Sequence, residues 1–400
     1  MSRVDYDLII VGGGLGGSAL AKAMAENGAR VLLLEREQHY RDRVRGEGTF
    51  PWGVVELDKL GLYQTLANEC AFEIDKLELY LGGMCVDRRD LRLTNPLPML
   101  NWVHHEMEEV LLQSAQDAGA EVWRGERACG VRSGPRPSVI VDRKERTDDL
   151  AARLVVCADG RGSLARKWAN FPVCQESYGM LLAGVLFERM PGVSPETNYW
   201  FLDSNAGHFA FLCPQRNRMV RAYVWHPGEW DYRYQGHEDL PRFVEDSGKA
   251  GVPREWYDGV QLAGPLATFD GTDNWVEHPY KDGIALIGDA AAASDPSYGQ
   301  GQSLTARDVR VLRDLLLSHD NWDEAGHAYA AEHDRYYGET HKFTGWLYSL
   351  FYENSSAADA RRSRAMPLLA QDLTRMPDVI VSGPDQPLDE SVRRRFFGED

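Results

Sequence analysis

The chain has 400 residues, which suits two interlocked domains, and its 61 acidic and 44 basic side chains give a net charge of −17. A surface this acidic repels nucleic-acid phosphates, and no apolar run reaches the roughly 18 residues of a membrane span, so neither nucleic acid nor a membrane is an expected partner. The six cysteines are scattered and include no C-x-x-C pair, which predicts reduced thiols and no metal site. The N-terminal residues are charged where a signal peptide would be apolar, which predicts a cytoplasmic protein.

The chain begins with a predicted strand–helix–strand unit. Residues 7–11 are a short apolar run, residues 18–28 are alanine-rich with apolar side chains at helical spacing, and residues 31–34 are a second apolar run. Such a unit places its two strands parallel and side by side, with the helix crossing one face. This part of the chain is therefore predicted to be α/β.

The turn between the first strand and the helix carries the pattern Gly12-x-Gly14-x-x-Gly17. In this context the pattern indicates dinucleotide binding, with Gly12 making the turn, Gly14 admitting a pyrophosphate and Gly17 allowing close helix–strand contact. The pyrophosphate would lie at the helix N-terminus. Glu35, at the end of the second strand, is predicted to bind ribose hydroxyls, and its charge disfavours NADP. This unit alone leaves FAD and NAD as alternatives.

The patterns that follow are mixed. Residues 41–66 end in a helical pattern, residues 74–95 alternate as strands do, and residues 103–118 predict an amphipathic helix. Residues 139–141 and 154–156 are predicted strands. Helices and strands therefore continue to alternate in this part of the chain.

The pattern changes at about residue 178. Residues 178–270 contain aromatic, partly alternating runs separated by Gly, Pro, Asn and Asp, which is typical of an antiparallel sheet. The α/β character returns near Ile284, and a helical pattern follows over about 304–352. The polar residues 353–400 are expected to wrap the surface or to be partly mobile.

These patterns predict an α/β fold with two interleaved domains. The predicted nucleotide-binding domain is discontinuous and comprises residues 1–75, 100–177 and 275–325. The second domain comprises residues 76–99 and 178–274. A C-terminal helical region with a tail comprises residues 326–400.

A second motif, Asp159-Gly160-x-x-Ser163-x-x-Arg166, follows the predicted strand 154–156. An aspartate, a glycine and a serine after a strand can simply start and cap a helix. Beside two other glycine motifs, a cofactor contact by Asp159 is the stronger prediction, and helix capping is the alternative.

The third motif begins at Gly288-Asp289 and ends at Pro296-x-x-Gly299-Gln300-Gly301. Asp289 can accept hydrogen bonds from a polyol chain such as ribityl, and glycines at a helix start expose N–H groups toward negative charge on a flavin ring. A strand–turn–helix connection without a ligand is the alternative. Together with Glu35 and the Asp159 motif, this segment favours FAD over NAD as the resident cofactor.

In this order and spacing, the three motifs resemble those of the single-component FAD-dependent aromatic hydroxylases of the para-hydroxybenzoate hydroxylase type, over most of residues 5–320. The resemblance implies a glutathione-reductase-like, Rossmann-like FAD domain with an interleaved antiparallel-sheet substrate domain and C-terminal helices. It implies a flavin-ring environment from Pro296, Gly299 and Gly301, and assigns no acid or base. The implied cofactor contacts are Gly12, Gly14, Gly17, Glu35, Arg36, Arg45, His104, Asp159, Gly288, Asp289, Gly299, Gln300 and Gly301.

Two positions depart from the pattern of this family. Ala292 stands where the family usually has histidine, and His104 stands where arginine or glutamine is common. The first departure resembles the outer members of the superfamily, which include geranylgeranyl reductases and flavin halogenases. The halogenase segment W-x-W-x-I-P is not in the sequence.

The resemblance implies a monooxygenase with tightly but non-covalently bound FAD. NAD(P)H would reduce FAD transiently, because the chain has one full dinucleotide fingerprint, and O2 would add at the flavin C4a position. The resulting hydroperoxide would hydroxylate an aromatic or polyketide-like small molecule. A reductase of the geranylgeranyl reductase type is the alternative, and a flavin-binding protein without catalysis is a third. The oligomeric state and the coenzyme, NADH or NADPH, stay open.

Aromatic residues of the predicted sheet are the candidates for a substrate chamber. Arg221 could pair with a substrate carboxylate, and His208 or His226 could deprotonate a phenol. For each of these residues, ordinary core packing or a surface position is the alternative. The candidate substrate contacts are Trp200, Phe209, Phe211, Arg221 and Tyr223.

Overall fold

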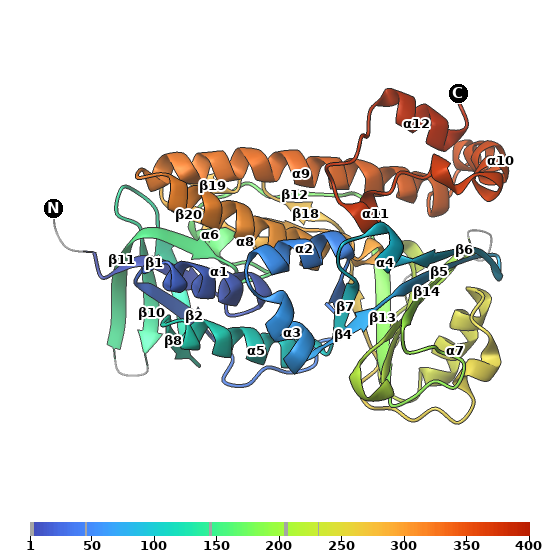
Figure 1. Ribbon diagram of the computed structural model, residues 1–400, viewed down its shortest axis with the longest axis horizontal. Coiled ribbons are helices and arrows are strands. Elements are labelled where there is room, and N and C mark those ends of the chain that lie inside the picture. Colours follow the sequence, from blue (N-terminus) through green and yellow to red (C-terminus); the bar gives the residue numbers. More distant parts are fainter. Residues whose placement is uncertain (1–3, 45, 144–145, 204–206, 231) are drawn as a thin grey trace.

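The computed structural model describes residues 4–44, 46–143, 146–203, 207–230 and 232–400. Two large sheets lie side by side, and two long helices run along them (Figure 1). The C-terminal helices lie beside the end of the longer of these two helices. The predicted α/β fold with an antiparallel second sheet and C-terminal helices is confirmed.

The first sheet has eight strands, and its parallel core has the order β20-β11-β1-β2-β8. The antiparallel pair β9 and β10 extends β11, and β19 pairs with β20 at the edge. The strands are β1 (Tyr6–Val11), β2 (Val31–Glu35), β8 (Glu121–Arg124), β9 (Arg127–Arg132), β10 (Ser138–Arg143), β11 (Arg146–Cys157), β19 (Tyr280–Lys281) and β20 (Ile284–Leu286).

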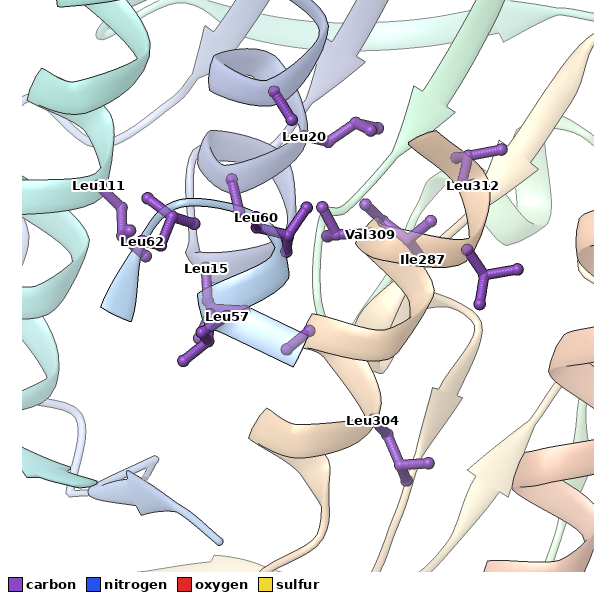
Figure 2. Close-up of a cluster of buried hydrophobic side chains, with 14 of the residues drawn as sticks. Leu15, Leu20, Leu57, Leu60, Leu62, Leu111, Ile287, Leu304, Val309 and Leu312 are labelled. Carbon is purple, nitrogen blue, oxygen red and sulfur yellow. The ribbon is translucent and has the colours of Figure 1, made fainter. Parts of the chain in front are cut away.

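Both faces of the central strands are buried, which explains their continuous apolar runs. Leu8 and Ile10 of β1 pack against the helices α1 (Leu15–Glu26), α5 (His104–Asp117) and α8 (Gly301–Ser318). Ile9 of β1 faces the opposite cluster, which contains β9, β10 and α6 (Ala165–Trp168). Leu15 and Leu20 of α1 belong to the same buried apolar cluster as Leu304, Val309 and Leu312 of α8, and Figure 2 shows part of this cluster. This packing holds the start of α1 against the carboxyl end of β1.

A smaller region joins the two large sheets. It contains α2 (Pro51–Lys59), α3 (Tyr63–Glu69) and the three-stranded sheet of β3 (Gly48–Thr49), β7 (Met99–Trp102) and β4 (Ala71–Ile74). A second three-stranded sheet contains β12 (Cys174–Gln175), β18 (Asn274–Trp275) and β21 (Ala292–Ala293).

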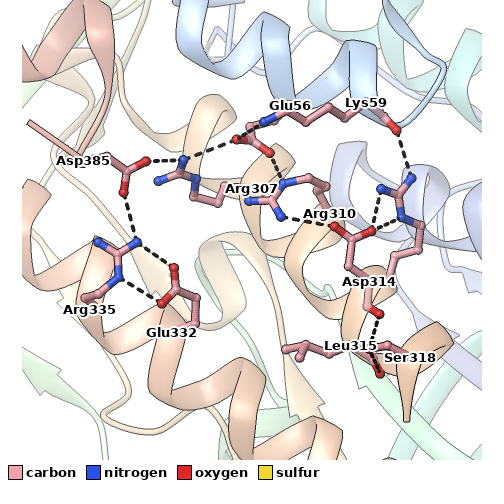
Figure 3. Close-up of polar contacts among 11 residues, drawn as sticks. Glu56, Lys59, Arg307, Arg310, Asp314, Leu315, Ser318, Glu332, Arg335 and Asp385 are labelled. Carbon is pink, nitrogen blue, oxygen red and sulfur yellow. Dashed lines mark hydrogen bonds and ion pairs between the residues drawn. The ribbon is translucent and has the colours of Figure 1, made fainter.

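Ion pairs fix α2 to α8. The side chain of Glu56 on α2 is only 2% exposed and pairs with Arg307 at 3.3 Å and with Arg310 (Figure 3). Asp385, from the C-terminal region, pairs with Arg307 at 2.6 Å and with Arg335 at 3.0 Å. Because a buried carboxylate is costly without its partners, these arginines fix the register between the helices.

The second large sheet has seven strands in the order β17-β13-β16-β15-β14-β5-β6 and is antiparallel except for the β14–β5 pair. One face packs against α7 (Leu240–Lys249), and the other face turns toward the smaller region and the C-terminal helices. The strands are β5 (Lys76–Leu81), β6 (Met84–Asp90), β13 (Met180–Phe187), β14 (Thr197–Asp203), β15 (His208–Pro214), β16 (Val220–Pro227) and β17 (Ala267–Asp270), with α4 (Leu91–Thr94) after β6.

The helical pattern predicted over 304–352 is two helices, α8 and α9 (Trp322–Phe351). Residues 353–400 lie along the surface, and much of this segment is helical, as α10 (Ser356–Gln371), α11 (Val379–Ser382) and α12 (Glu390–Phe397). Although this segment is polar in composition, aromatic contacts attach it to the rest of the fold. Phe396 and Phe397 are buried against Phe343 and Trp346 of α9.

No helix among the described residues is both long and apolar enough to cross a membrane. All six cysteines are free thiols. Within the described part of the chain, no group of three or more His, Cys, Asp or Glu side chains is placed to hold a metal ion.

Candidate cofactor and substrate site

A cavity of about 350 Å³ is lined by residues from all three motifs and from the seven-stranded sheet. We call the part lined by the motifs the cofactor side, and the part lined by the seven-stranded sheet, Glu47, Phe50, Met99 and Asn101 the sheet side. Of the residues predicted from the sequence, Gly17, Phe209, Arg221 and Gln300 lie outside the lining, and Arg45 lies outside the described residues. The predicted residues that line the cavity are Gly12, Gly14, Glu35, Arg36, His104, Asp159, Gly288, Asp289, Pro296, Gly299, Gly301, Trp200, Phe211 and Tyr223.

The glycines of the first motif differ in what surrounds them. A Cβ on Gly12, whose φ is +106°, would lie 2.3 Å from the carbonyl oxygen of Ala158, and a Cβ on Gly17 would lie 1.8 Å from that of Gly12. These two glycines permit the turn and the close contact of α1 with β1. A Cβ on Gly14 would meet only the carboxylate of Glu108, at 3.5 Å, so this backbone is open to the cavity. The N-terminus of α1 therefore offers backbone N–H groups to an anion.

The carboxylate of Glu35 is fixed at the end of β2. Its two oxygens accept hydrogen bonds of 2.7 Å from the backbone N–H groups of Gly13 and Glu37. Burial raises the pKa of Glu35, although these hydrogen bonds oppose the shift. The side chain lines the cavity, and its orientation is set by the turn itself.

His104 begins α5 and contacts two acceptors. Its Nδ1 lies 3.0 Å from the carbonyl oxygen of Gly46, and its Nε2 lies 3.4 Å from the carboxylate of Glu108. Burial lowers the pKa of His104, but the hydrogen bond and charge of Glu108 outweigh it, so that the net shift is upward. The imidazole is thus biased toward the cation at a position where the resemblance implied arginine or glutamine.

The second motif caps a helix and also reaches the third motif. The carboxylate of Asp159 accepts hydrogen bonds from the backbone N–H groups of Leu164 and Ala165, and the hydroxyl of Ser163 accepts one from the backbone N–H of Arg166, so both side chains support the start of α6. The other oxygen of Asp159 is buried and has no hydrogen-bond partner among the described residues. The guanidinium of Arg166 in turn donates hydrogen bonds to the third motif.

The backbone of the third motif is held from two sides. The guanidinium of Arg166 donates to the carbonyl oxygens of Asp289 and Ala290, at 2.8 and 2.7 Å. The N–H of Gly288 donates to the buried carboxylate of Asp308 on α8, at 2.6 Å. These contacts leave the side chain of Asp289 in the cavity lining.

Ala292 lies in the short strand β21, opposite Trp275 of β18. It is buried, and the ring of Trp275 packs against His341 with centroids 4.6 Å apart. The position where the family resemblance implied histidine is therefore occupied by the small side chain of Ala292, in a strand that pairs with β18.

A tight turn over Pro296–Tyr298 leads into α8. Asp295 accepts a hydrogen bond from the N–H of Ser297, at 2.8 Å, and Gly299 adopts a φ of +66°. The side chain of Gln300 is buried, accepts a hydrogen bond from Trp52 and donates one to the carbonyl oxygen of Tyr298. The side chain of Gln300 therefore stabilises the turn, while Gly301 faces the cavity.

The sheet side of the cavity is built from paired aromatic residues. Phe211 lies between Trp200 and Tyr223 across β14, β15 and β16. Phe209 shares this face but packs against Tyr352 after α9, with ring centroids 4.2 Å apart, which removes Phe209 from the lining. The end of α9 thus covers part of the sheet.

Arg221 lies on the same face of β16 as Tyr223 but is fully buried. Its guanidinium pairs with Asp42 at 2.8 Å and with Glu47 at 3.2 Å. Glu47 lines the cavity but was not predicted from the sequence as a site residue. Its position between Gly46 and Gly48 was the one signal that could have indicated it.

His208 and His226, the two candidate bases, lie outside the cavity lining. His226 stacks on Tyr232 with ring centroids 4.0 Å apart, and His208 lies 3.3 Å from the carboxylate of Asp246 on α7. Both histidines belong to a polar cluster beside α7.

The residues of the cofactor side fit FAD. The backbone at Gly14 is open to the cavity, the N-termini of α1 and α8 both point into the lining, and α8 begins without a side-chain cap from a described residue. The buried oxygens Asp159 Oδ1 and Ser294 Oγ have no partner within the described part of the chain. Anionic phosphates and hydroxyl-bearing groups satisfy such donors and acceptors.

The fold and this cavity define a dinucleotide-binding protein with an aromatic-lined chamber. The chain matches the model of the FAD-binding domain family over residues 5–347, and it therefore belongs to this family. The match confirms FAD as the cofactor that the three motifs predict.

Three curated relatives match most of the chain. Squalene monooxygenase SE2 of Panax ginseng is 24% identical over 336 residues, which cover 78% of this chain but only 58% of that protein. A digeranylgeranylglycerophospholipid reductase of Methanocella arvoryzae is 26% identical, with 86% and 84% covered. The 3-demethoxyubiquinol 3-hydroxylase of Escherichia coli K12 is 26% identical, with 82% and 84% covered.

The fold is also that of a solved flavoenzyme. The p-nitrophenol 4-monooxygenase PnpA from Pseudomonas putida DLL-E4 superposes with a TM-score of 0.78 at 18% identity, covering 96% of this chain and 99% of that one. At this identity the likeness concerns the fold.

Proposed function

We propose that the protein is an FAD-dependent monooxygenase that uses NAD(P)H and O2 to hydroxylate an aromatic or polyketide-like small molecule. One observation carries this proposal: the cofactor side and the aromatic sheet side belong to the same cavity, and the Pro296–Gly301 turn contributes to its lining. FAD supplies the electron transfer and the activation of O2. The chain has to bind FAD, orient the substrate and exclude water.

The roles of the cofactor-side residues follow from their positions. The N–H groups at Gly14 bind the pyrophosphate, and Glu35 accepts hydrogen bonds from ribose hydroxyls. Asp289 accepts hydrogen bonds from the ribityl chain. Gly299 and Gly301 give the flavin ring access to the backbone at the start of α8, whose N–H groups favour negative charge.

The residues on the sheet side position the substrate. Trp200, Phe211 and Tyr223 offer flat apolar surface that excludes water and stacks on an aromatic ring. NAD(P)H is a transient co-substrate that reaches the flavin through the same cavity. The domain boundaries and the cytoplasmic location stay predictions from the sequence.

A reductase is the second candidate. One matched relative is named a digeranylgeranylglycerophospholipid reductase, and Ala292 departs from the hydroxylase pattern. The two candidates differ in their need for oxygen. A reductase turns over a substrate at full rate without O2, whereas a monooxygenase consumes O2 and NAD(P)H in proportion to product.

The test is a panel of aromatic compounds scored for stimulated NAD(P)H oxidation by the FAD-loaded protein. Oxygen uptake is measured with an electrode and the product by mass spectrometry after turnover in ¹⁸O2. Label in the product, and loss of product formation under argon, are expected. Undiminished turnover under argon would establish the reductase instead.

The site is tested with Asp289→Ala and a matched control. Asp289→Ala should give folded protein with little bound FAD. Asp142→Ala, at an exposed position on β10, should keep full FAD content. Normal FAD content in Asp289→Ala would refute the assigned role of Asp289.

A further inference from the structure

The sheet side of the cavity is mainly apolar. Leu182, Trp200, Phe211, Trp225 and Phe269 form its wall. The polar side chains among its described lining are few, and the carboxyl group of Glu47 lies among them beside the hydroxyl of Tyr223, at 3.2 Å. The chamber thus combines flat apolar surface with one carboxyl group.

The cation on this face of the sheet is not accessible. Arg221 has no exposed surface, and the carboxylates of Asp42 and Glu47 lie 2.8 and 3.2 Å from its guanidinium. Arginine stays protonated, and Glu47 and Asp42 raise its pKa further against the opposing effect of burial. The guanidinium therefore already faces two carboxyl groups, and it cannot pair with a substrate in the chamber because Arg221 does not line the cavity.

The other cations of the described lining lie on the cofactor side, and they include the imidazole of His104, whose Nε2 lies 3.4 Å from the carboxylate of Glu108. Arg36 follows β2, and Arg127 lies on β9. Arg43 donates to Glu37 at 2.8 Å, and Arg161 donates to the carbonyl oxygen of Thr272. Among the described residues, the sheet side therefore offers no free cation to a substrate.

Glu47 makes the chamber unfavourable for an anion in either charge state. Ionised, it adds negative charge to a guanidinium that Asp42 already neutralises, and it repels a carboxylate. Protonated, which burial promotes by raising the pKa of Glu47, it leaves the substrate carboxylate buried without a cation. A hydroxyl or N–H group on a substrate, in contrast, finds acceptors in Glu47 and Tyr223.

We infer that the chamber selects an uncharged aromatic substrate without a carboxylate, and that Glu47 and Tyr223 bind a hydroxyl or N–H group at the edge of its ring. This inference deepens the proposed function and rests on it, since FAD must fill the cofactor side. Glu47 and Tyr223 are specificity-determining residues, and Arg221 is a positioning residue that holds Glu47.

The experiment compares matched ligands on the FAD-loaded protein without NAD(P)H, so that binding is measured without turnover. Isothermal titration calorimetry is carried out with phenol against para-hydroxybenzoate and with naphthol against hydroxynaphthoate, pairs that differ by one carboxylate. The neutral member should bind at least about tenfold more tightly, because a like charge at an interface is strongly unfavourable. Equal or tighter binding of the carboxylates overturns the inference, and so does failure of both neutral probes to bind.

Glu47→Gln tests the residue itself. This variant should reduce the preference for the neutral ligands by about tenfold, while Glu26→Gln, an exposed carboxylate on α1, should leave it unchanged. An unchanged preference in a folded, FAD-loaded Glu47→Gln variant contradicts the role of the Glu47 charge in selecting the substrate. If this variant does not fold, the ligand pairs on the unmodified protein still decide.

The failure of this inference is distinct from that of the proposed function. A preference for neutral ligands without oxygen-dependent turnover would remove the monooxygenase and leave the inference standing. Oxygen-dependent turnover of a carboxylated substrate, bound more tightly than its neutral counterpart, would do the reverse.

Discussion

The guanidinium of Arg166 donates a 2.8 Å hydrogen bond to the backbone carbonyl of Asp289. Two motifs that lie far apart in the sequence are therefore joined through one buried side chain. A second bond, of 2.7 Å, reaches the next carbonyl, that of Ala290. The planar fork of arginine suits two adjacent acceptors, which lysine cannot reproduce.

Arg166→Lys should therefore lower the free energy of unfolding by about 2–3 kcal/mol, because it leaves buried carbonyl groups without donors. It should also weaken FAD binding, since the turn at Asp289 loses support. Thermal unfolding and an FAD titration measure both effects. Arg132→Lys, at an exposed ion pair, is the matched control and should change stability by less than about 0.5 kcal/mol. Equal behaviour of the two variants would contradict this role of Arg166.

Two glycines of the first motif should separate FAD binding from stability. Gly14 has a φ of −70°, which any residue adopts, and its backbone is open to the cavity. Gly14→Val should keep the fold and abolish FAD binding. Gly17→Ala brings a Cβ within 1.8 Å of a backbone oxygen and should lower the unfolding free energy by about 1–3 kcal/mol or more. Retained FAD affinity in folded Gly14→Val would refute the placement of the pyrophosphate.

Asp295 should make stability fall as pH rises. Burial raises the pKa of Asp295 to about 6, against hydrogen bonds from Ser297 and the charge of Arg161, which lower it. The folded state then binds this proton more tightly than the unfolded state, so the contribution of Asp295 to stability is fully present below pH about 4 and is lost as pH rises through about 6. Asp295→Asn keeps the acceptor for Ser297 and should be more stable than the unmodified protein by about 3 kcal/mol at pH 8.

Chemical unfolding at pH 4 and pH 8 measures this difference, which should vanish at pH 4. Asp270→Asn is the opposite control. Burial raises the pKa of Asp270, but hydrogen bonds from Thr272 and the charge of Arg161 reverse this, and the net shift is downward. Its ionised form stabilises the fold above its ordinary pKa, so Asp270→Asn should be relatively less stable at pH 8. A difference for Asp295→Asn that is the same at both pH values would count against its buried, protonated state.

Gly184→Ala should change ligand binding without changing FAD content. A Cβ at this position on β13 would lie 2.5 Å from the ring of Tyr223 and 2.6 Å from Val44. Displacing Tyr223 should weaken binding of naphthol by about tenfold or more, because naphthol loses both its contact with the Tyr223 ring and a hydrogen-bond partner. Gly248→Ala, where a Cβ meets no atom within 4 Å, is the control. Unchanged naphthol affinity would show that the chamber tolerates a shifted Tyr223.

The sequence predicts those parts of the site whose backbone is determined by neighbouring residues, namely the two glycine-containing turns. The strand, turn and helix at Gly12–Gly17 follow from an apolar run, three glycines and helical spacing, all within one short segment. The turn at Pro296–Gly301 follows in the same way. In both places the residues that determine the backbone are neighbours in the sequence.

The contacts that decide the substrate chamber are not local. Arg221 was predicted from the sequence as a candidate for a substrate carboxylate, but its partner Asp42 is 179 positions away in the sequence. Phe209 and Phe211 lie two positions apart on β15 and therefore share one face of the sheet. Only the contact with Tyr352, just after α9, determines that Phe209 is covered. No periodicity encodes such pairings, because they depend on how strands and helices far apart in the chain come together.

The helix α9 has a mechanical consequence. Its 30 residues bond at one end to the first sheet, where Tyr329 donates to the carbonyl of Leu286, and at the other end Tyr352 accepts a hydrogen bond from Trp225 of the second sheet. Hinge bending between the sheets would have to break or unwind this continuous rod. Ligand entry should therefore proceed through local motion of side chains and loops, with both sheets held at a fixed angle.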